Sequence, residues 1–374
     1  MTDADDALDL LRALVREDTA AVEAALAAPG TDLAKFLRFA HQHQLGAYAY
    51  WMLRRLGAAR ALPPPVLAAT KASSLADRLR TERLAERLRQ LAELFAAGGV
   101  PVLFIKGPLF AQRFYGSLDA RGFADLDLLL RSPGELDRVE ALLLEAGYER
   151  AFRTLMGRTA SRYFAHHFEY RRDALGLDVH WALQRHFTFA IDYERMWATS
   201  APVVFGDRAY RAASDEYELV LQLLGLLTDL QVGKLVLRSL VDVYRVLRTV
   251  DGTLDWPAFF AARRRERIER PCAYLLAVVL DVLACRAQFP ALDALLDARA
   301  SALPPTRLAR HAVLASRKAD VRQKLLSFRL YETAPAAAFA WWLVSLPFRF
   351  AVYDAAPRPP AAARRTVVAR PDLR

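Results

Sequence analysis

The segment from Val102 to Leu130, VLFIKGPLFAQRFYGSLDARGFADLDLLL, gives the clearest structural signal in this 374-residue chain. Its two ends, residues 102–105 and 126–130, are short apolar runs of the length and composition typical of strands buried within a sheet. A Lys-Gly pair follows the first run, and two aspartates separated by one leucine stand at the start of the second. Both predicted strands therefore border charged side chains.

The two aspartates, Asp125 and Asp127, are expected on one face of the second strand, because successive side chains alternate between the faces of a strand. Burying two like charges costs several kcal/mol apiece unless a cation compensates, and Mg²⁺, or Mn²⁺ in its place, suits carboxylate ligands. Neutralising either aspartate is then expected to stabilise the metal-free protein. Exposed loop aspartates are the alternative, but the apolar residues 128–130 directly after the pair favour a core strand.

A third carboxylate is available downstream in Gly176-Leu-Asp-Val-His-Trp181. Asp178 and His180 are expected to share one face of a strand that lies beside the Asp125/Asp127 strand. Three aspartates would then surround one pocket, which predicts a metal-dependent phosphate site. A histidine at such a position is more often a hydrogen-bonded structural residue than a ligand or base, so both interpretations of His180 stay open.

These motifs, taken in order, resemble the uncharacterised nucleotidyltransferase family within the DNA polymerase β-like superfamily. The resemblance rests on Lys106-Gly107, Arg121, Asp125-x-Asp127 and Asp178-Val-His180-Trp181. It extends more weakly over residues 36–256, including LVDVYRVL at 240–247. The chain departs from the wider superfamily at Lys106-Gly107-Pro108, where a Gly-Ser turn is usual.

The resemblance implies transfer of a nucleoside monophosphate from a nucleoside triphosphate, with ATP the expected donor, to a hydroxyl, phosphate or amine. The acceptor would be a small molecule, a peptide or a protein. Asp125, Asp127 and Asp178 would be the catalytic metal ligands. Lys106 and Arg121 would pair with phosphate oxygens, Gly107 would let the backbone approach the phosphates, and His180 would lie against the bound nucleotide. The alternative is a non-catalytic protein on the same fold that binds a nucleotide or a partner.

The expected fold class is α+β, with the mixed sheet of a nucleotidyltransferase core implied by the resemblance. The predicted regions are a helical N-terminal region at 1–95, the core at 96–212, a helical C-terminal domain at 213–350 and a disordered tail at 351–374. Breaks are predicted at residues 28–30 and 63–65, and Gly98-Gly99 should end a long helix.

Local patterns add further elements to the predicted core. A short helix is expected at 109–115, and another should begin at Ser132-Pro133 with Ser132 as its cap. Residues 163–170 and 175–183 alternate as a hairpin that carries Asp178. A second hairpin is expected at 202–210, with Gly206-Asp207 at its turn.

Composition narrows the remaining possibilities. Two isolated cysteines, Cys272 and Cys285, indicate neither a disulfide framework nor a zinc site, which fits the cytoplasm. The acidic, amphipathic N-terminus differs from a signal peptide, and the apolar tract at 334–346 is too short to span a bilayer. The formal charge of +10 could attract nucleic acid, but the arginines are mostly scattered among acidic residues. The run at 263–267 lacks neighbouring exposed aromatics, so a nucleic acid partner is not expected. The sequence contains no P-loop, dinucleotide-binding or protein-kinase motif set.

Overall fold

The computed structural model describes residues 3–28, 31–151, 165–173, 175–184, 189–232 and 236–307, together with residues 330, 340, 343 and 344. The chain begins with a group of helices, as predicted. They are α1 (Asp3–Val15), α2 (Thr19–Ala27), α3 (Leu33–Gln42), α4 (Gly46–Arg55), a 3₁₀ turn at Ala58–Ala61, and α5 (Pro64–Ala97).

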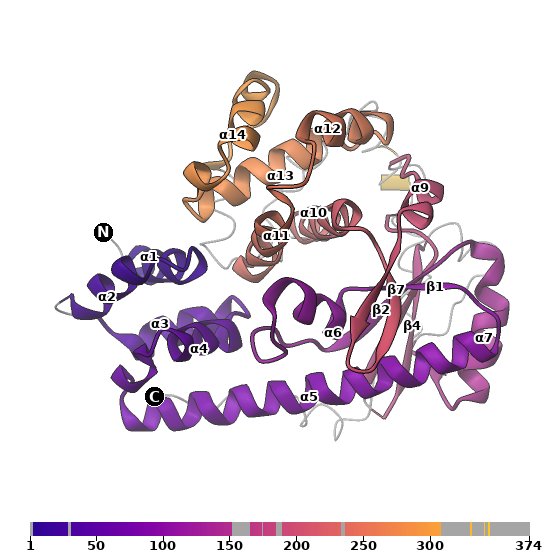
Figure 1. The fold of residues 1–374 in the computed structure, drawn as a ribbon, viewed down its shortest axis with the longest axis horizontal. Helices are drawn as coiled ribbons and strands as arrows, with labels where there is room; N and C mark the ends of the chain where they lie inside the picture. The colour runs from indigo at the N-terminus through magenta and orange to yellow at the C-terminus, as the bar shows by residue number, and fades with distance from the viewer. Residues whose placement is uncertain are drawn as a thin grey trace.

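Helix α5 connects the N-terminal helices to the rest of the molecule. Proline is favoured in the first turn of a helix, and α5 begins at the second proline of the cluster at residues 63–65. It ends before Gly98-Gly99, where Gly99 adopts a φ of 62° that L-residues disfavour. In Figure 1 the helix runs along the lower edge, from the N-terminal helices to the sheet. It packs against α4 at one end and against β2 and α7 at the other.

The described residues contain a five-stranded sheet with the order β1-β2-β5-β4-β3. The strands are β1 (Val102–Ile105), β2 (Asp125–Leu130), β3 (Glu149–Arg150), β4 (His167–Arg172) and β5 (Leu175–His180). Strands β2 and β5 pair in parallel, whereas the other pairs are antiparallel. The predicted α+β fold with a mixed sheet is therefore confirmed. Residues 163 and 164 of the predicted first hairpin lie outside the described part of the chain.

The connections within the sheet follow the local sequence signals. Between β1 and β2 the chain forms α6 (Gly107–Phe110), continued by one π-helical turn at Ala111–Tyr115. A 3₁₀ turn at Pro133–Glu135 leads into α7 (Leu136–Glu145). Ser132 and Glu135 form a reciprocal capping box, which satisfies backbone donors at the start of this helical segment.

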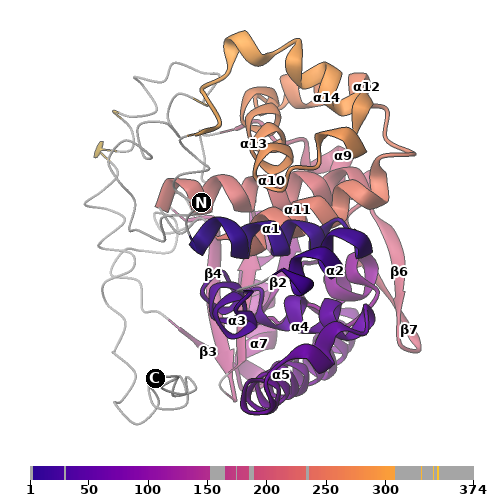
Figure 2. The ribbon, with the colours of Figure 1, turned by 90° about the vertical axis from the view of Figure 1, so that its left-hand side faces the viewer.

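The C-terminal part of the described chain is mainly helical. Its elements are α9 (Tyr193–Ala198), β6 (Ala201–Phe205), β7 (Arg208–Ala212), α10 (Asp215–Val232), α11 (Leu237–Val250), α12 (Trp256–Arg265), α13 (Glu269–Val282), α14 (Pro290–Asp297), and 3₁₀ turns at Arg286–Gln288 and Ala300–Ala302. Strands β6 and β7 form the predicted hairpin, which extends along one side of the molecule in Figure 2. Cys272 and Cys285 are buried, and no disulfide bond joins them.

Apolar residues from the N-terminal helices, the sheet and the C-terminal helices belong to one continuous buried cluster. The division into domains at residues 95, 212 and 350 stays a prediction. The expected disordered tail lies outside the described residues. A helix able to cross a membrane is absent from the described part of the chain.

Candidate active site on the sheet

The strand register brings the predicted acidic residues together on one face of the sheet. Asp127 on β2 lies opposite Asp178 on β5, and Asp178 lies opposite Glu169 on β4. Residues directly opposite each other on paired strands point to the same face. Asp125, two positions before Asp127, shares this face. The sheet thus carries a row of three carboxylates with a fourth beside it.

A row of histidines adjoins the row of carboxylates. His180 lies two residues after Asp178 on β5, and its partner on β4 is His167. The His180 Nε2 atom is 3.1 Å from Asp127 Oδ1. Burial lowers the pKa of His180 to about 4, although the Asp127 carboxylate acts in the opposite direction. His180 is therefore neutral near pH 7 and donates its single ring proton to Asp127.

Asp127 is the best compensated carboxylate of the row. Its side chain is 9% exposed, and its Oδ1 lies 3.5 Å from Lys106 Nζ as well as near His180. Burial alone would raise the pKa of Asp127, but the Lys106 charge and the His180 hydrogen bond outweigh it and lower that pKa. Neutralising Asp127 is therefore expected to destabilise the metal-free protein, contrary to the expectation from the sequence.

The pKa values of Asp178 and Asp125 are raised, in contrast to that of Asp127. Burial, with added repulsion from Asp127 and Asp125, raises the pKa of Asp178 to about 8. Burial and the neighbouring Asp127 also raise the pKa of Asp125. Burial and mutual repulsion therefore disfavour the state in which all the carboxyl groups of this face are ionised. Ligand atoms of Asp127, Asp178 and His180 lie within 4.8 Å of one another, so the donor set suits a divalent cation.

The turn after β1 adopts an unusual backbone conformation. Lys106 has a φ of 58° with a ψ of −151°, a region that is essentially restricted to glycine. Gly107 follows with a φ of 65°, and a Cβ atom there would lie 3.2 Å from Leu126 Cδ2. Pro108 then occupies the first turn of α6. The turn is strained and holds Lys106 against Asp127, and such strain is concentrated at functional sites.

Arg121 forms an ion pair with Asp242, and its charge also acts on Asp125 of the acidic face. Its Nε–H group donates a hydrogen bond to Asp242 Oδ1 of α11 at 3.0 Å, and its Nη2–H group donates one to Asp242 Oδ2 at 2.9 Å. The two side chains are 12% and 5% exposed, and the Tyr115 hydroxyl donates to the same carboxylate at 2.6 Å. This buried network joins the segment before β2 to the C-terminal helices. The contact of Arg121 with phosphate stays a prediction.

Arg238, at the start of α11, is a cation that the sequence motifs did not single out. Its charge acts on Asp125 and Asp229. Its Nε atom is buried and has no hydrogen-bond partner among the described residues. Burial and the like charge of Arg121 lower the pKa of Arg238. Arg238 thus has one buried Nε–H donor that the described residues leave unused, and its charge acts on Asp125 of the acidic face.

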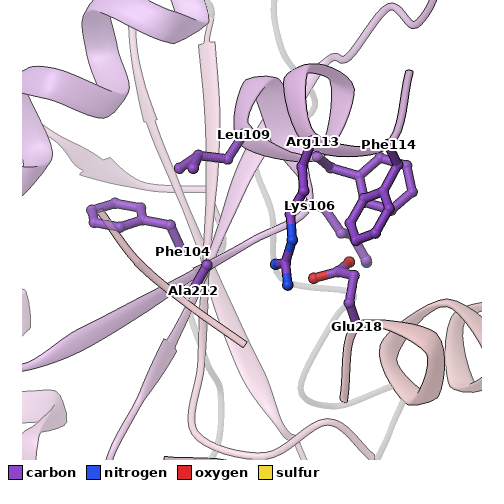
Figure 3. Close-up of a pocket in the computed structure, with 8 residues that line it drawn as sticks. Phe104, Lys106, Leu109, Arg113, Phe114, Ala212 and Glu218 are labelled. Atoms are coloured by element: carbon purple, nitrogen blue, oxygen red, sulfur yellow. The ribbon is translucent and has the colours of Figure 1, made fainter. Parts of the chain in front are cut away.

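A small hollow lies next to Lys106, and Figure 3 shows its lining. Most of the lining is apolar, and its charged members are Lys106, Arg113 and Glu218. Glu218 is 3% exposed, and burial raises the pKa of its carboxyl even though the Arg113 charge opposes this. Arg113 and Glu218 face each other across the hollow in Figure 3.

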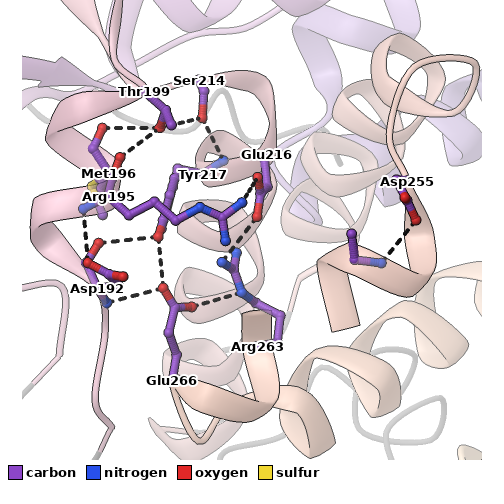
Figure 4. Close-up of polar contacts among 11 residues, drawn as sticks. Asp192, Arg195, Met196, Thr199, Ser214, Glu216, Tyr217, Asp255, Arg263 and Glu266 are labelled. Atoms are coloured by element: carbon purple, nitrogen blue, oxygen red, sulfur yellow. Dashed lines mark hydrogen bonds and ion pairs between the residues drawn. The ribbon is translucent and has the colours of Figure 1, made fainter. Parts of the chain in front are cut away.

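The basic run at residues 263–267 does not form a continuous cationic surface. Arg263 is fully buried and pairs with Glu216 and with Glu266, at 3.2 Å and 2.8 Å. Figure 4 shows this network, in which the Tyr217 hydroxyl also donates to Glu266. Arg264 pairs with Glu269. These two arginines hold α12 against α10 and α13, and they give no support to nucleic acid binding.

An acidic face on a mixed sheet, with helices on either side in the sequence, fits a metal-dependent transferase of nucleotide groups. Residues 29–284, more than half of the chain, match the family described as uncharacterised nucleotidyltransferase. The protein belongs to this nucleotidyltransferase family, and the resemblance expected from the sequence motifs is confirmed.

Individual proteins resemble this chain only weakly. No curated protein matches the chain significantly. Among solved structures, one match is the solution structure of the antibiotic-resistance factor ANT(2'')-Ia. It shares 16% sequence identity, covers 62% of this chain and 98% of that chain, and has a TM-score of 0.25. At this TM-score the likeness does not bear on the fold or function of the chain.

Proposed function

We propose that the protein transfers a nucleoside monophosphate from a nucleoside triphosphate, with ATP the expected donor, to a hydroxyl, phosphate or amine acceptor, releasing pyrophosphate. The observation that supports this most is the alignment of Asp127 with Asp178 on parallel neighbouring strands, with Asp125 on the same face. Family membership supplies the reaction class. The acceptor is a small molecule, a peptide or a protein.

The acidic face fits a divalent metal ion, Mg²⁺ or Mn²⁺. Asp125, Asp127 and Asp178 would hold it, and a bound cation would favour the ionised forms of Asp125 and Asp178, whose pKa values are raised by burial and by neighbouring carboxylates. When bound, such an ion orients the triphosphate and stabilises negative charge on the leaving pyrophosphate. Asp127 would remain ionised throughout, because Lys106 and His180 stabilise its charged form.

Cationic residues around the face would bind the triphosphate. Lys106 projects from the strained turn with 37% of its side chain exposed, so its ammonium group can reach a ligand while it contacts Asp127. Arg238 has one buried donor, its Nε–H group, that is not used by the described protein groups. An arginine can bind phosphate oxygens in a forked geometry, whereas lysine acts as a point charge. Arg121 would make the forked contact, although its guanidinium also pairs with Asp242.

The turn after β1 would bring backbone groups close to the phosphates. Gly107 lacks a side chain that would shield its N–H group, and its left-handed conformation turns the chain directly into α6. This turn would take the place of the Gly-Ser turn that is usual in the wider superfamily.

Label transfer tests the proposal directly. The full chain is incubated with Mg²⁺, each of the four nucleoside triphosphates labelled at the α-phosphate, and a pool of small metabolites and peptides. We expect the α-label in a product, with release of unlabelled pyrophosphate, and loss of both in Asp125→Asn and Asp178→Asn. Asp207→Asn, at the exposed β6–β7 turn, is the matched control. Binding of triphosphate without transfer to any acceptor would favour the non-catalytic alternative.

A further inference from the structure

Three histidines gather at the end of β5, next to the row of carboxylates. His167 and His180 are partners across β4 and β5, and His166 directly precedes β4. The His167 and His180 rings stack with centroids 4.9 Å apart, and the His166 ring lies 4.5 Å and 5.8 Å from them. One ring nitrogen from each histidine lies within 4.8 Å of the other two. Three imidazoles are thus close enough to share one metal ion.

His180 is arranged like a metal-ligating histidine. Its Nε2 atom donates to Asp127 Oδ1 at 3.1 Å, which leaves Nδ1 with a lone pair. The Nδ1 atom is buried and has no hydrogen-bond partner among the described residues. Histidines that bind metals commonly donate their other ring N–H to a carboxylate, which fixes the tautomer and makes the ligating nitrogen more basic. Asp127 is placed to have this effect on His180.

The spacing of the other two histidines also matches a metal site. His166 Nε2 and His167 Nδ1 are 3.3 Å apart. Two nitrogens bound to one tetrahedral ion at about 2.0–2.1 Å lie roughly 3.3–3.4 Å from each other. The 3.3 Å contact between these two nitrogens is therefore also the spacing of two ligands of one ion, and a ring nitrogen of His180 lies within 4.8 Å of both.

We propose that His166, His167 and His180 bind one divalent transition-metal ion of the zinc class, with Asp127 orienting His180. The site shares His180 with the donor set of Asp127, Asp178 and His180, but its three neutral imidazoles favour zinc, copper, iron or nickel over magnesium. Three protein ligands leave a fourth position open to water or a substrate atom, as in catalytic zinc sites. The ion would lie beside the face at which the triphosphate is proposed to bind.

Cobalt titration tests this site without any turnover. Chelator-treated full-length protein is titrated with Co²⁺ in excess Mg²⁺, so that the carboxylate site is occupied. We expect one Co²⁺ per chain with the visible spectrum of four-coordinate cobalt, displaced by Zn²⁺. His166→Ala and His167→Ala should each weaken Co²⁺ binding at least tenfold and abolish the spectrum. His41→Ala, on α3, is the matched control and should bind like the wild type.

Asp178→Asn distinguishes this site from the proposed nucleotide site. It should retain the four-coordinate Co²⁺ spectrum while losing Mg²⁺-dependent nucleotide binding. Co²⁺ binding that survives both histidine substitutions, or that disappears in Asp178→Asn, overturns the proposal. If the histidine variants fail to fold, Cu²⁺ bound to the wild type gives a second readout. Its electron paramagnetic resonance spectrum should contain hyperfine coupling to imidazole nitrogens, and a spectrum with oxygen ligands alone overturns the proposal as well.

Discussion

Replacing Asp178 by asparagine should stabilise the metal-free protein, and the gain should grow with pH. Burial and repulsion from neighbouring carboxylates raise the pKa of Asp178 from 3.8 to about 8. Below pH 4 the carboxyl is protonated in both the folded and the unfolded chain, so Asp178 does not affect stability there. Between pH 4 and pH 8 the folded chain keeps a proton that the unfolded chain releases, so stability falls as pH rises. Asparagine carries no such penalty.

The size of the gain follows from the same pKa values. At pH 7 the folded chain holds the proton about 3 pH units above the unfolded pKa, which costs about 4 kcal/mol at 1.36 kcal/mol per unit. This is an upper limit, because water reaches part of the side chain. For 374 residues unfolding with ~2.1 cal/mol/K of entropy each, 4 kcal/mol corresponds to about 5 °C in Tm.

Thermal unfolding in chelator from pH 4 to pH 8 measures this effect. The difference in Tm between Asp178→Asn and the wild type should be near zero at pH 4 and largest at pH 8. Asp207→Asn should show no such trend, because that side chain is exposed at a turn. An Asp178→Asn variant that is less stable than the wild type at every pH would refute the electrostatic account of this face.

Three further substitutions test other parts of the site by urea unfolding in chelator at pH 7. Asp127→Asn should destabilise the protein by about 1–3 kcal/mol, because it weakens contacts with a lysine and a histidine; a gain in stability would contradict this. Gly107→Ala should cost about 1–3 kcal/mol, because its φ is 65° and a Cβ would crowd a leucine; an unchanged midpoint would argue against strain. Arg121→Met should lower the free energy of unfolding by about 3–5 kcal/mol, because it leaves the Asp242 charge buried and unpaired. Adding Asp242→Leu should recover part of this loss, because that buried charge is then removed as well. Equal instability of the single and double variants would count against a buried ion pair.

The sequence was sufficient to predict those parts of the site that depend on alternation along one strand. Asp125 and Asp127 share a face because strands have a period of two, and the same rule placed Asp178 with His180. Glu169 and His167 were missed, because their contribution depends on the register of β4 against β5. The alternation of HFEYRR in β4 is the signal that could have identified them.

Contacts between distant segments could not be predicted from local pattern. The phosphate contact of Arg121, which the family resemblance implies, stays a prediction, but no sequence pattern indicated its ion pair with Asp242, which lies in a helix far along the chain. An arginine that is near a phosphate site in sequence has the same local pattern whether it binds a ligand or a buried carboxylate. Arg238 was missed for a related reason. Its electrostatic effect on Asp125 depends on where α11 packs, and no motif marks it.

Calorimetric titration of ATP into the chelator-treated protein, with and without Mg²⁺, tests the central claim most directly. The claim is that Asp125, Asp127 and Asp178 form a metal-dependent nucleotide site. We predict saturable ATP binding in Mg²⁺, at least tenfold weaker binding without it, and loss of the Mg²⁺ effect in Asp178→Asn but not in Asp207→Asn. Equal ATP binding with and without Mg²⁺, or a Mg²⁺ effect that persists in Asp178→Asn, would contradict the account.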